Sequence, residues 1–125
     1  MNNLNEKLKQ IQIEDYIWII YIGIILLSWY SNYLEKKYYI NNDLESKKKY
    51  REIMLTIFTI LIFVYFYFLK DSYDSLKTIN ENTSEKTKNL LYLSFLASLL
   101  IFISGLIFLY ISITDEDLNV ELAFN

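Results

Sequence analysis

Four carboxylates near the ends of two apolar segments are the residues best suited to chemistry. Glu14 and Asp15 precede the first apolar segment, and Asp71 and Asp74 follow the second. If both segments cross a membrane, all four lie near the same face, and carboxylate oxygens are the ligands that hard divalent cations prefer. The alternative is that they are ordinary polar residues at the boundaries of apolar segments. We favour this alternative, so we expect no metal site.

The rest of the chain offers no catalytic constellation. It contains no His and no Cys, which removes thiolate nucleophiles, disulfides, the usual zinc ligands and the commonest general base. There is no serine paired with a base, no phosphate-binding loop and no nucleotide-binding motif. The net charge of -3 gives no basis for a nucleic-acid partner. We therefore expect no catalytic residues, no cofactor, no nucleic acid and no small-molecule substrate.

Apolar residues gather in three blocks, and nearly all charged residues lie between them. The blocks span 16–34, 53–69 and 90–113. As a helix the second block is about 26 Å long, close to the roughly 30 Å of a hydrocarbon core. A soluble three-helix bundle would show charge at every third or fourth position, and isolated strands in lipid would leave backbone groups unpaired. The sequence predicts an all-α, small polytopic membrane protein with three transmembrane helices packed as an antiparallel bundle.

The flanking segments complete a single membrane domain over 1–125. Residues 3–15 have the apolar spacing of a short amphipathic helix, which either lies in the interface or extends the first span. The 70–89 loop is expected to stay partly helical. Residues 114–125 form an acidic tail. The first apolar block is too long, and its preceding region too neutral, for a cleaved signal peptide.

Polar residues at the starts of the second and third helices suit capping. Asn42 or Asp43 is the candidate N-cap of the second helix, with Glu45 placed as in a capping box after Asn42. Ser84 or Thr83 is the candidate N-cap of the third.

Basic residues decide the orientation only weakly. Three crossings place the 35–52 loop on the same side as the C-terminal tail, and each side of the membrane then carries six basic residues. The flanks of the first two spans favour the 35–52 loop and the C-terminus in the cytoplasm. Aromatic residues near the span ends are typical of an aromatic belt at the headgroups; a stacking surface for a ligand is the alternative.

Small residues follow the third span. They are Ser94, Ala97, Ser98, Ser104, Gly105 and Ser112. In lipid, small residues let helix backbones approach closely, and serine can hydrogen-bond across the contact. The line is either an interface with a second copy or another membrane protein, or the surface that packs on the chain's own spans. In either case Gly105 is the position at which a larger side chain should disturb the packing most.

A basic cluster lies in the loop between the first two spans. It consists of Lys47, Lys48, Lys49 and Arg51. One hypothesis is that it contacts anionic lipid, at about 1 kcal/mol per base. A second is that the acidic tail folds back onto it, and a third is that it is simply solvated.

The absence of charged residues from the interior of the spans bears on function. None of the three blocks contains Asp, Glu, Lys or Arg between its ends, and such residues mark proton relays and ion pathways. Thr56 and Thr59 share one face and either line a pore or bond their own helix carbonyls. We therefore expect a multi-pass protein of the cell membrane, without catalysis, acting as an accessory or self-associating helix-packing protein. Its partners would be the lipid bilayer and either itself or another membrane protein. A small oligomeric, holin-like pore is the alternative, and a membrane-embedded enzyme the third.

Overall fold

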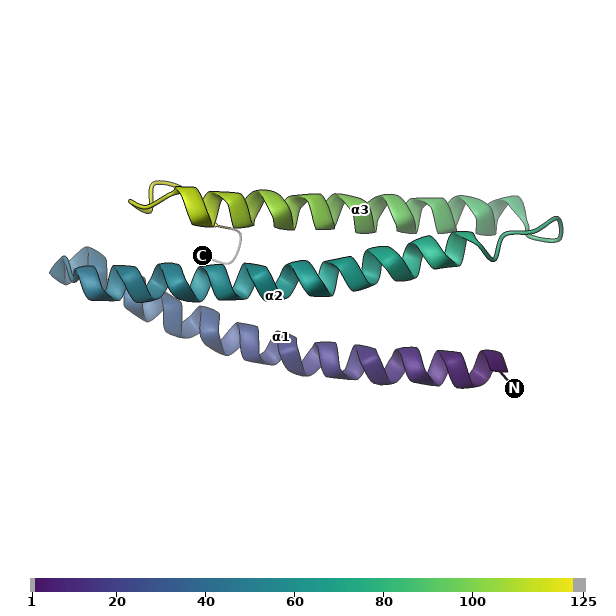
Figure 1. Cartoon of the computed structure of the whole chain (residues 1–125), viewed down its shortest axis with the longest axis horizontal. Helices are drawn as coiled ribbons and strands as arrows, with labels where there is room; N and C mark the ends of the chain where they lie inside the picture. The colour runs from purple at the N-terminus through teal and green to yellow at the C-terminus, as the bar shows by residue number, and fades with distance from the viewer. Residues whose placement is uncertain (1, 123–125) are drawn as a thin grey trace. The chain divides into compact units, whose positions relative to one another are not determined.

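Three helices make up most of the computed structural model, which describes residues 2–122, with side chains from Asn3 onward. They are α1 (Asn2–Asn41), α2 (Leu44–Leu76) and α3 (Glu85–Thr114), shown in chain order in Figure 1. The described residues contain no strand. All three helices are long and apolar enough to cross a membrane. The prediction of an all-α chain with three such helices is confirmed.

α1 and α2 extend well beyond their apolar blocks, whereas α3 exceeds its block by five residues at its start and one at its end. At 1.5 Å per residue, α1, α2 and α3 are about 60, 50 and 45 Å long, whereas a hydrocarbon core is roughly 30 Å thick. Residues 3–15 continue into α1 without a break, and α2 runs past residue 69 to Leu76. Polar flanks rich in Lys, Glu and Leu favour helix, and the chain has no proline to end it.

The chain divides into two compact units whose boundary lies inside α2. The first contains α1 and the start of α2 as far as Met54; the second contains α2 from Leu55 onward and α3.

The turn of the first unit is organised by Asp43. Asn42 has a φ of 53°, a left-handed conformation that Asn tolerates and that ends α1. One Asp43 carboxylate oxygen accepts the Glu45 backbone N–H at 3.2 Å, and the other accepts the Ser46 hydroxyl at 2.9 Å. Lys37 Nζ lies 3.5 Å from the second oxygen. The Ser46 hydroxyl bond, supported by backbone N–H groups and Lys37, lowers the pKa of Asp43 below its ordinary value of 3.8.

Asp43, not Asn42, is therefore the N-cap of α2. The capping box drawn from Asn42 to Glu45 is wrong, because the cap lies one residue later. Glu45 instead faces along the helix, where its carboxylate lies 3.8 Å from Lys49 Nζ.

The second unit is an antiparallel pair of helices. Ring contacts join the two helices in reverse order along their length, with centroid distances of 5.5, 5.9 and 6.0 Å for Phe58–Phe108, Phe66–Phe102 and Tyr73–Phe95. As the residue number rises along α2, that of its partner on α3 falls, which fixes the antiparallel direction (Figure 1).

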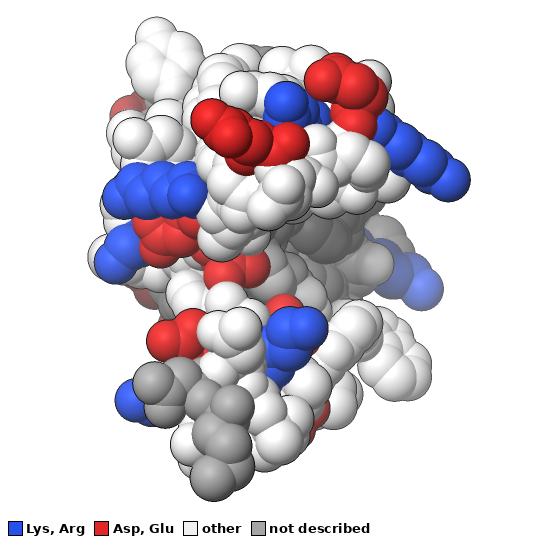
Figure 2. Space-filling model, turned by 90° about the vertical axis from the view of Figure 1, so that its right-hand side faces the viewer, with Lys and Arg blue, Asp and Glu red and all other residues white. Residues whose placement is uncertain are grey.

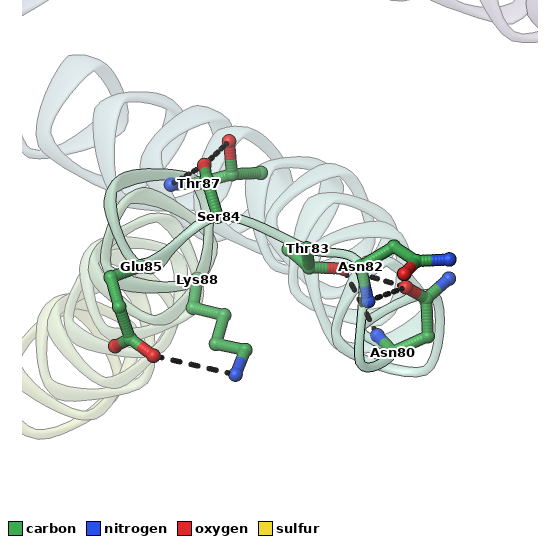
Figure 3. A network of polar contacts seen from close by, with 7 residues as sticks. All are labelled: Asn80, Asn82, Thr83, Ser84, Glu85, Thr87 and Lys88. Atoms are coloured by element: carbon green, nitrogen blue, oxygen red, sulfur yellow. Dashed lines mark hydrogen bonds and ion pairs between the residues drawn. The ribbon is translucent and has the colours of Figure 1, made fainter.

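Side-chain hydrogen bonds close the turn between α2 and α3 (Figure 3). Ser84 is the N-cap of α3: its hydroxyl accepts the Thr87 backbone N–H at 3.2 Å and donates to the Thr87 hydroxyl at 2.9 Å. Thr83 instead accepts the Asn80 backbone N–H at 3.0 Å, and the Asn80 side chain accepts the Asn82 backbone N–H at 2.8 Å. Of the two predicted caps, Ser84 is confirmed.

Charges of both signs surround this turn. Figure 2 shows basic and acidic side chains interspersed at the end of the molecule that carries it. Lys77 lies 3.6 Å from Asp74, and Lys88 lies 3.5 Å from Glu85. Exposed pairs of this kind contribute about 0 to 1 kcal/mol each, so they mark a solvated end rather than a source of stability.

The tail after α3 folds locally around Asp115. The Asp115 backbone N–H donates to the Ile111 carbonyl at 2.8 Å and ends the helix. Its carboxylate accepts the backbone N–H groups of Asn119 and Val120 at 3.0 and 2.8 Å. Hydrogen bonds to Asp115 therefore stabilise the local conformation of the tail. A contact between the tail and the basic loop stays a prediction.

Candidate functional site

The contact between α2 and α3 is tight at Gly105. A Cβ atom at this position would lie 2.9 Å from Cδ2 and 3.2 Å from Cε2 of the Tyr65 ring, and 3.7 Å from Cγ1 of Ile62. Two non-bonded carbon atoms do not lie 2.9 Å apart, so the ring or the helix would have to move to admit this Cβ. Glycine at this point is therefore what allows the Tyr65 ring to lie against the α3 backbone.

Two aromatic contacts flank Gly105, one helical turn to either side. The Phe58 side chain is 1% exposed and stacks on Phe108, with the ring planes 22° apart. Phe66 meets Phe102 at 53°. Aromatic pairs contribute about 0.5–1.5 kcal/mol beyond the area they bury. The contact between the helices thus has a backbone approach at its centre and aromatic rings on both sides.

The predicted line of small residues divides into two groups. Gly105 and Ser112 are buried and Ser98 is half-buried, whereas Ser94, Ala97 and Ser104 are exposed. The Ser112 hydroxyl donates to the Phe108 carbonyl of its own helix at 2.9 Å.

These positions bear on the two alternatives left open by the sequence. At Gly105 the neighbour is α2 of the same chain. The exposed group is not part of that contact, so an interface with a second copy or another protein stays a prediction for those three residues.

Sequence reasoning missed the other half of the contact. Tyr65 lies in the aromatic run 65–68 near the end of the second apolar block, where the sequence predicts a membrane-interface belt, yet its ring packs on Gly105. A helix that is apolar all round has no polar stripe to indicate which face is turned inward. The only signal available was the coincidence of a lone glycine on one span and large rings on the other.

The basic cluster of the first unit is partly engaged by its neighbours. Lys47 Nζ lies 5.3 Å from the centroid of the Tyr38 ring, and Lys49 pairs with Glu45. Arg51 is half-buried, whereas Lys48 is exposed and has no partner among residues 2–122. The prediction that this cluster contacts lipid or the tail remains open.

The metal site and the threonine-lined pore, two alternatives raised by the sequence, gain no support from the described residues. Within residues 2–122, no three carboxylates come close enough together to hold a metal ion. The Thr59 hydroxyl donates to the Leu55 carbonyl of its own helix at 2.7 Å, which is the arrangement expected of a threonine that satisfies its own backbone.

These features define a class of protein: a small all-α chain with three helices fit to cross a membrane, two of which meet through glycine and aromatic rings. Comparison with models of protein families, with characterised proteins and with solved structures finds no match. The function is therefore argued from the geometry of this chain alone.

Proposed function

We propose that this chain is a non-catalytic, multi-pass protein of the cell membrane that works through helix–helix contacts, as an accessory subunit of another membrane protein or as a self-associating unit. The observation that carries the proposal is the contact at Gly105. Lipid tails are as apolar as leucine, so helices in a bilayer associate through close packing rather than through the hydrophobic effect. A glycine set against an aromatic ring is a contact of that kind.

The length of the helices supports their placement across the bilayer. Each exceeds the hydrocarbon core, so its polar flanks reach the headgroups and the water beyond. In this placement the aromatic residues at the span ends form belts at the two interfaces. The 35–52 loop and the C-terminus lie in the cytoplasm. Fusing a reporter that works only in the cytoplasm to each terminus tests this orientation, and a cytoplasmic N-terminus would contradict it.

The exposed small residues of α3 are the surface we assign to the partner. Ser94, Ala97 and Ser104 lie at spacings of three and seven residues, which places them on one side of α3. Small side chains there would let a second helix approach its backbone.

Native co-purification in mild detergent tests the proposal. We expect either one stoichiometric partner or a defined homo-oligomer, lost when Ala97→Leu and Ser104→Leu are combined. Leu106→Phe is the matched control, because it adds bulk at another exposed position of α3. A monomer that brings down no stoichiometric partner would refute the proposal. Dye leakage from vesicles containing the purified chain would favour the pore instead.

A further inference from the structure

The C-terminal half of α1 carries a surface whose chemistry changes in order along the helix. Leu26, Trp29, Tyr30 and Tyr33 line a shallow groove of about 330 Å³. Lys36 and Lys37 follow one turn later. The steps between successive members are one or three residues, so all six lie on one side of α1. From the membrane interior outward, the order is aliphatic, then aromatic, then basic.

We propose that this side of α1 binds an anionic phospholipid, whose acyl chain lies along the groove and whose phosphate meets Lys36 and Lys37. The inference rests on the membrane placement of α1 proposed above. The order of side chains matches the order of groups in a phospholipid. Leu26 meets the acyl chain, and the amphipathic rings lie at the level of the glycerol and headgroup. The lysine stems continue along the groove and carry their ammonium groups to the phosphate.

The groove side chains are open to such a ligand. The exposed fraction is 60% for Leu26, 75% for Trp29 and 61% for Tyr33. The groove is formed by residues of α1 alone. A lipid also fits better than a protein here, because the bilayer already surrounds an apolar face of this kind and no further partner is needed to cover it.

Charge favours an anionic headgroup at this end of the helix. Residues 35–52 contain six basic and four acidic residues, a net charge of +2. The other polar segments are neutral or negative: 70–89 has four residues of each sign, 1–15 has two basic and three acidic, and 114–125 has four acidic residues. The aromatic groove therefore adjoins the one segment of the chain with excess positive charge.

The two lysines contribute differently. Lys36 is exposed, and its side chain has no ion pair, hydrogen bond or ring contact among residues 2–122. Lys37 lies 3.5 Å from Asp43, but that carboxylate also accepts the Ser46 hydroxyl and the Glu45 N–H. Lys37 can therefore turn to a phosphate without leaving Asp43 unbonded. Each lysine near an anionic surface is worth about a five-fold increase in relative binding.

Tryptophan quenching reads out this site directly. The chain has two tryptophans, and Trp18→Phe leaves Trp29 as the reporter in the groove. The full chain is placed in vesicles with equal amounts of phosphatidylglycerol and phosphatidylcholine, with the bromine quencher on the acyl chains of one lipid or the other. We expect relative binding of phosphatidylglycerol at Trp29 to be stronger by up to about 25-fold, falling to near equality when Lys36→Gln and Lys37→Gln are combined.

Two controls keep the outcomes distinct. Lys86→Gln removes another exposed lysine without a described partner, at the start of α3, and is expected to keep the preference. Trp29→Phe leaves Trp18 as the reporter near the other end of the apolar block. There we expect no preference for phosphatidylglycerol over phosphatidylcholine. Equal quenching of Trp29 by the two lipids, or a preference that survives the double lysine change, would overturn the lipid site. Absence of quenching by either lipid at both tryptophans would instead overturn the membrane placement itself.

Discussion

Replacing Gly105 by alanine tests whether the contact between α2 and α3 depends on the absence of a side chain. The new Cβ would lie 2.9 Å from Cδ2 of Tyr65, whereas ordinary contacts begin at 3.4 Å. The ring or the helix must therefore withdraw by about half an ångström. Overpacking of a filled contact costs about 1–3 kcal/mol.

An opposing effect reduces the observed loss. Alanine is favoured over glycine inside a helix by about 0.5–1 kcal/mol. The net destabilisation by Gly105→Ala is thus expected to be about 0–2.5 kcal/mol. Gly23→Ala is the matched control, because a Cβ at Gly23 would meet nothing within 4 Å. Gly23→Ala should show only the stabilisation that alanine gives to a helix. The changes in stability caused by Gly105→Ala and Gly23→Ala should therefore differ by about 1–3 kcal/mol.

A single buried thiol supplies the assay. The chain has no cysteine, and Ser112 on α3 is 6% exposed, so Ser112→Cys places one protected thiol on that helix. Its rate of labelling in detergent reports how often α3 opens. Each 1.4 kcal/mol lost from the closed state raises the open population about ten-fold.

Combining Gly105→Ala with Tyr65→Ala tests whether the Tyr65 ring causes the destabilisation. If the Tyr65 ring is what excludes the methyl group, Gly105→Ala should accelerate labelling in the native background and slow it, or leave it unchanged, once the ring is gone. The coupling between the two sites should then be about 1–3 kcal/mol. A penalty of the same size with and without the ring, or equal effects of Gly105→Ala and Gly23→Ala, would refute the reasoning.

Three further changes test other parts of the structure. Ser84→Ala should destabilise the first turn of α3 by about 1 kcal/mol through loss of the N-cap, seen as faster amide exchange there, whereas Ser94→Ala should leave exchange unchanged. Phe58→Ala should cost about 3–5 kcal/mol in the thiol assay, and less when Phe108→Ala is already present, because the stacking partner is gone. Because the pKa of Asp43 is lowered in the folded state, its stabilising contribution is present above pH 3.8 and is lost as pH falls through the lowered value. Amide exchange at the start of α2 should therefore accelerate in acid, and this pH dependence should vanish in Asp43→Asn.

The number of helices could be predicted because its signal is local. Each apolar block exceeds what a strand needs and lacks internal charge, and in lipid a helix satisfies its own backbone. The cap at Ser84 was predictable for the same reason, since capping depends on a residue and the three that follow it. The cap at Asp43 was less certain because two adjacent residues, Asn42 and Asp43, both have suitable side chains.

The ends of the helices and the partner of Gly105 were harder to predict. Hydropathy marks the apolar part of a helix and is silent about polar flanks, so the predicted spans are much shorter than α1 and α2. The facing residue depends on the register between two helices. In a soluble amphipathic helix the polar stripe would indicate that register. Within the apolar blocks of α2 and α3 there is no such stripe, and Tyr65 could not be chosen among its aromatic neighbours.

The same uniformity explains why one glycine matters so much to this chain. Two helices that are apolar all round can rotate against each other in lipid with little change in solvation, because every face is equally acceptable to acyl chains. Shape must then select the register. Gly105 is the point of α3 where the Tyr65 ring can reach the backbone, and the stacked Phe58 and Phe108 rings lie one turn away. Rotating α3 would lose both contacts at once. A chain built in this way specifies one packing arrangement of α2 against α3.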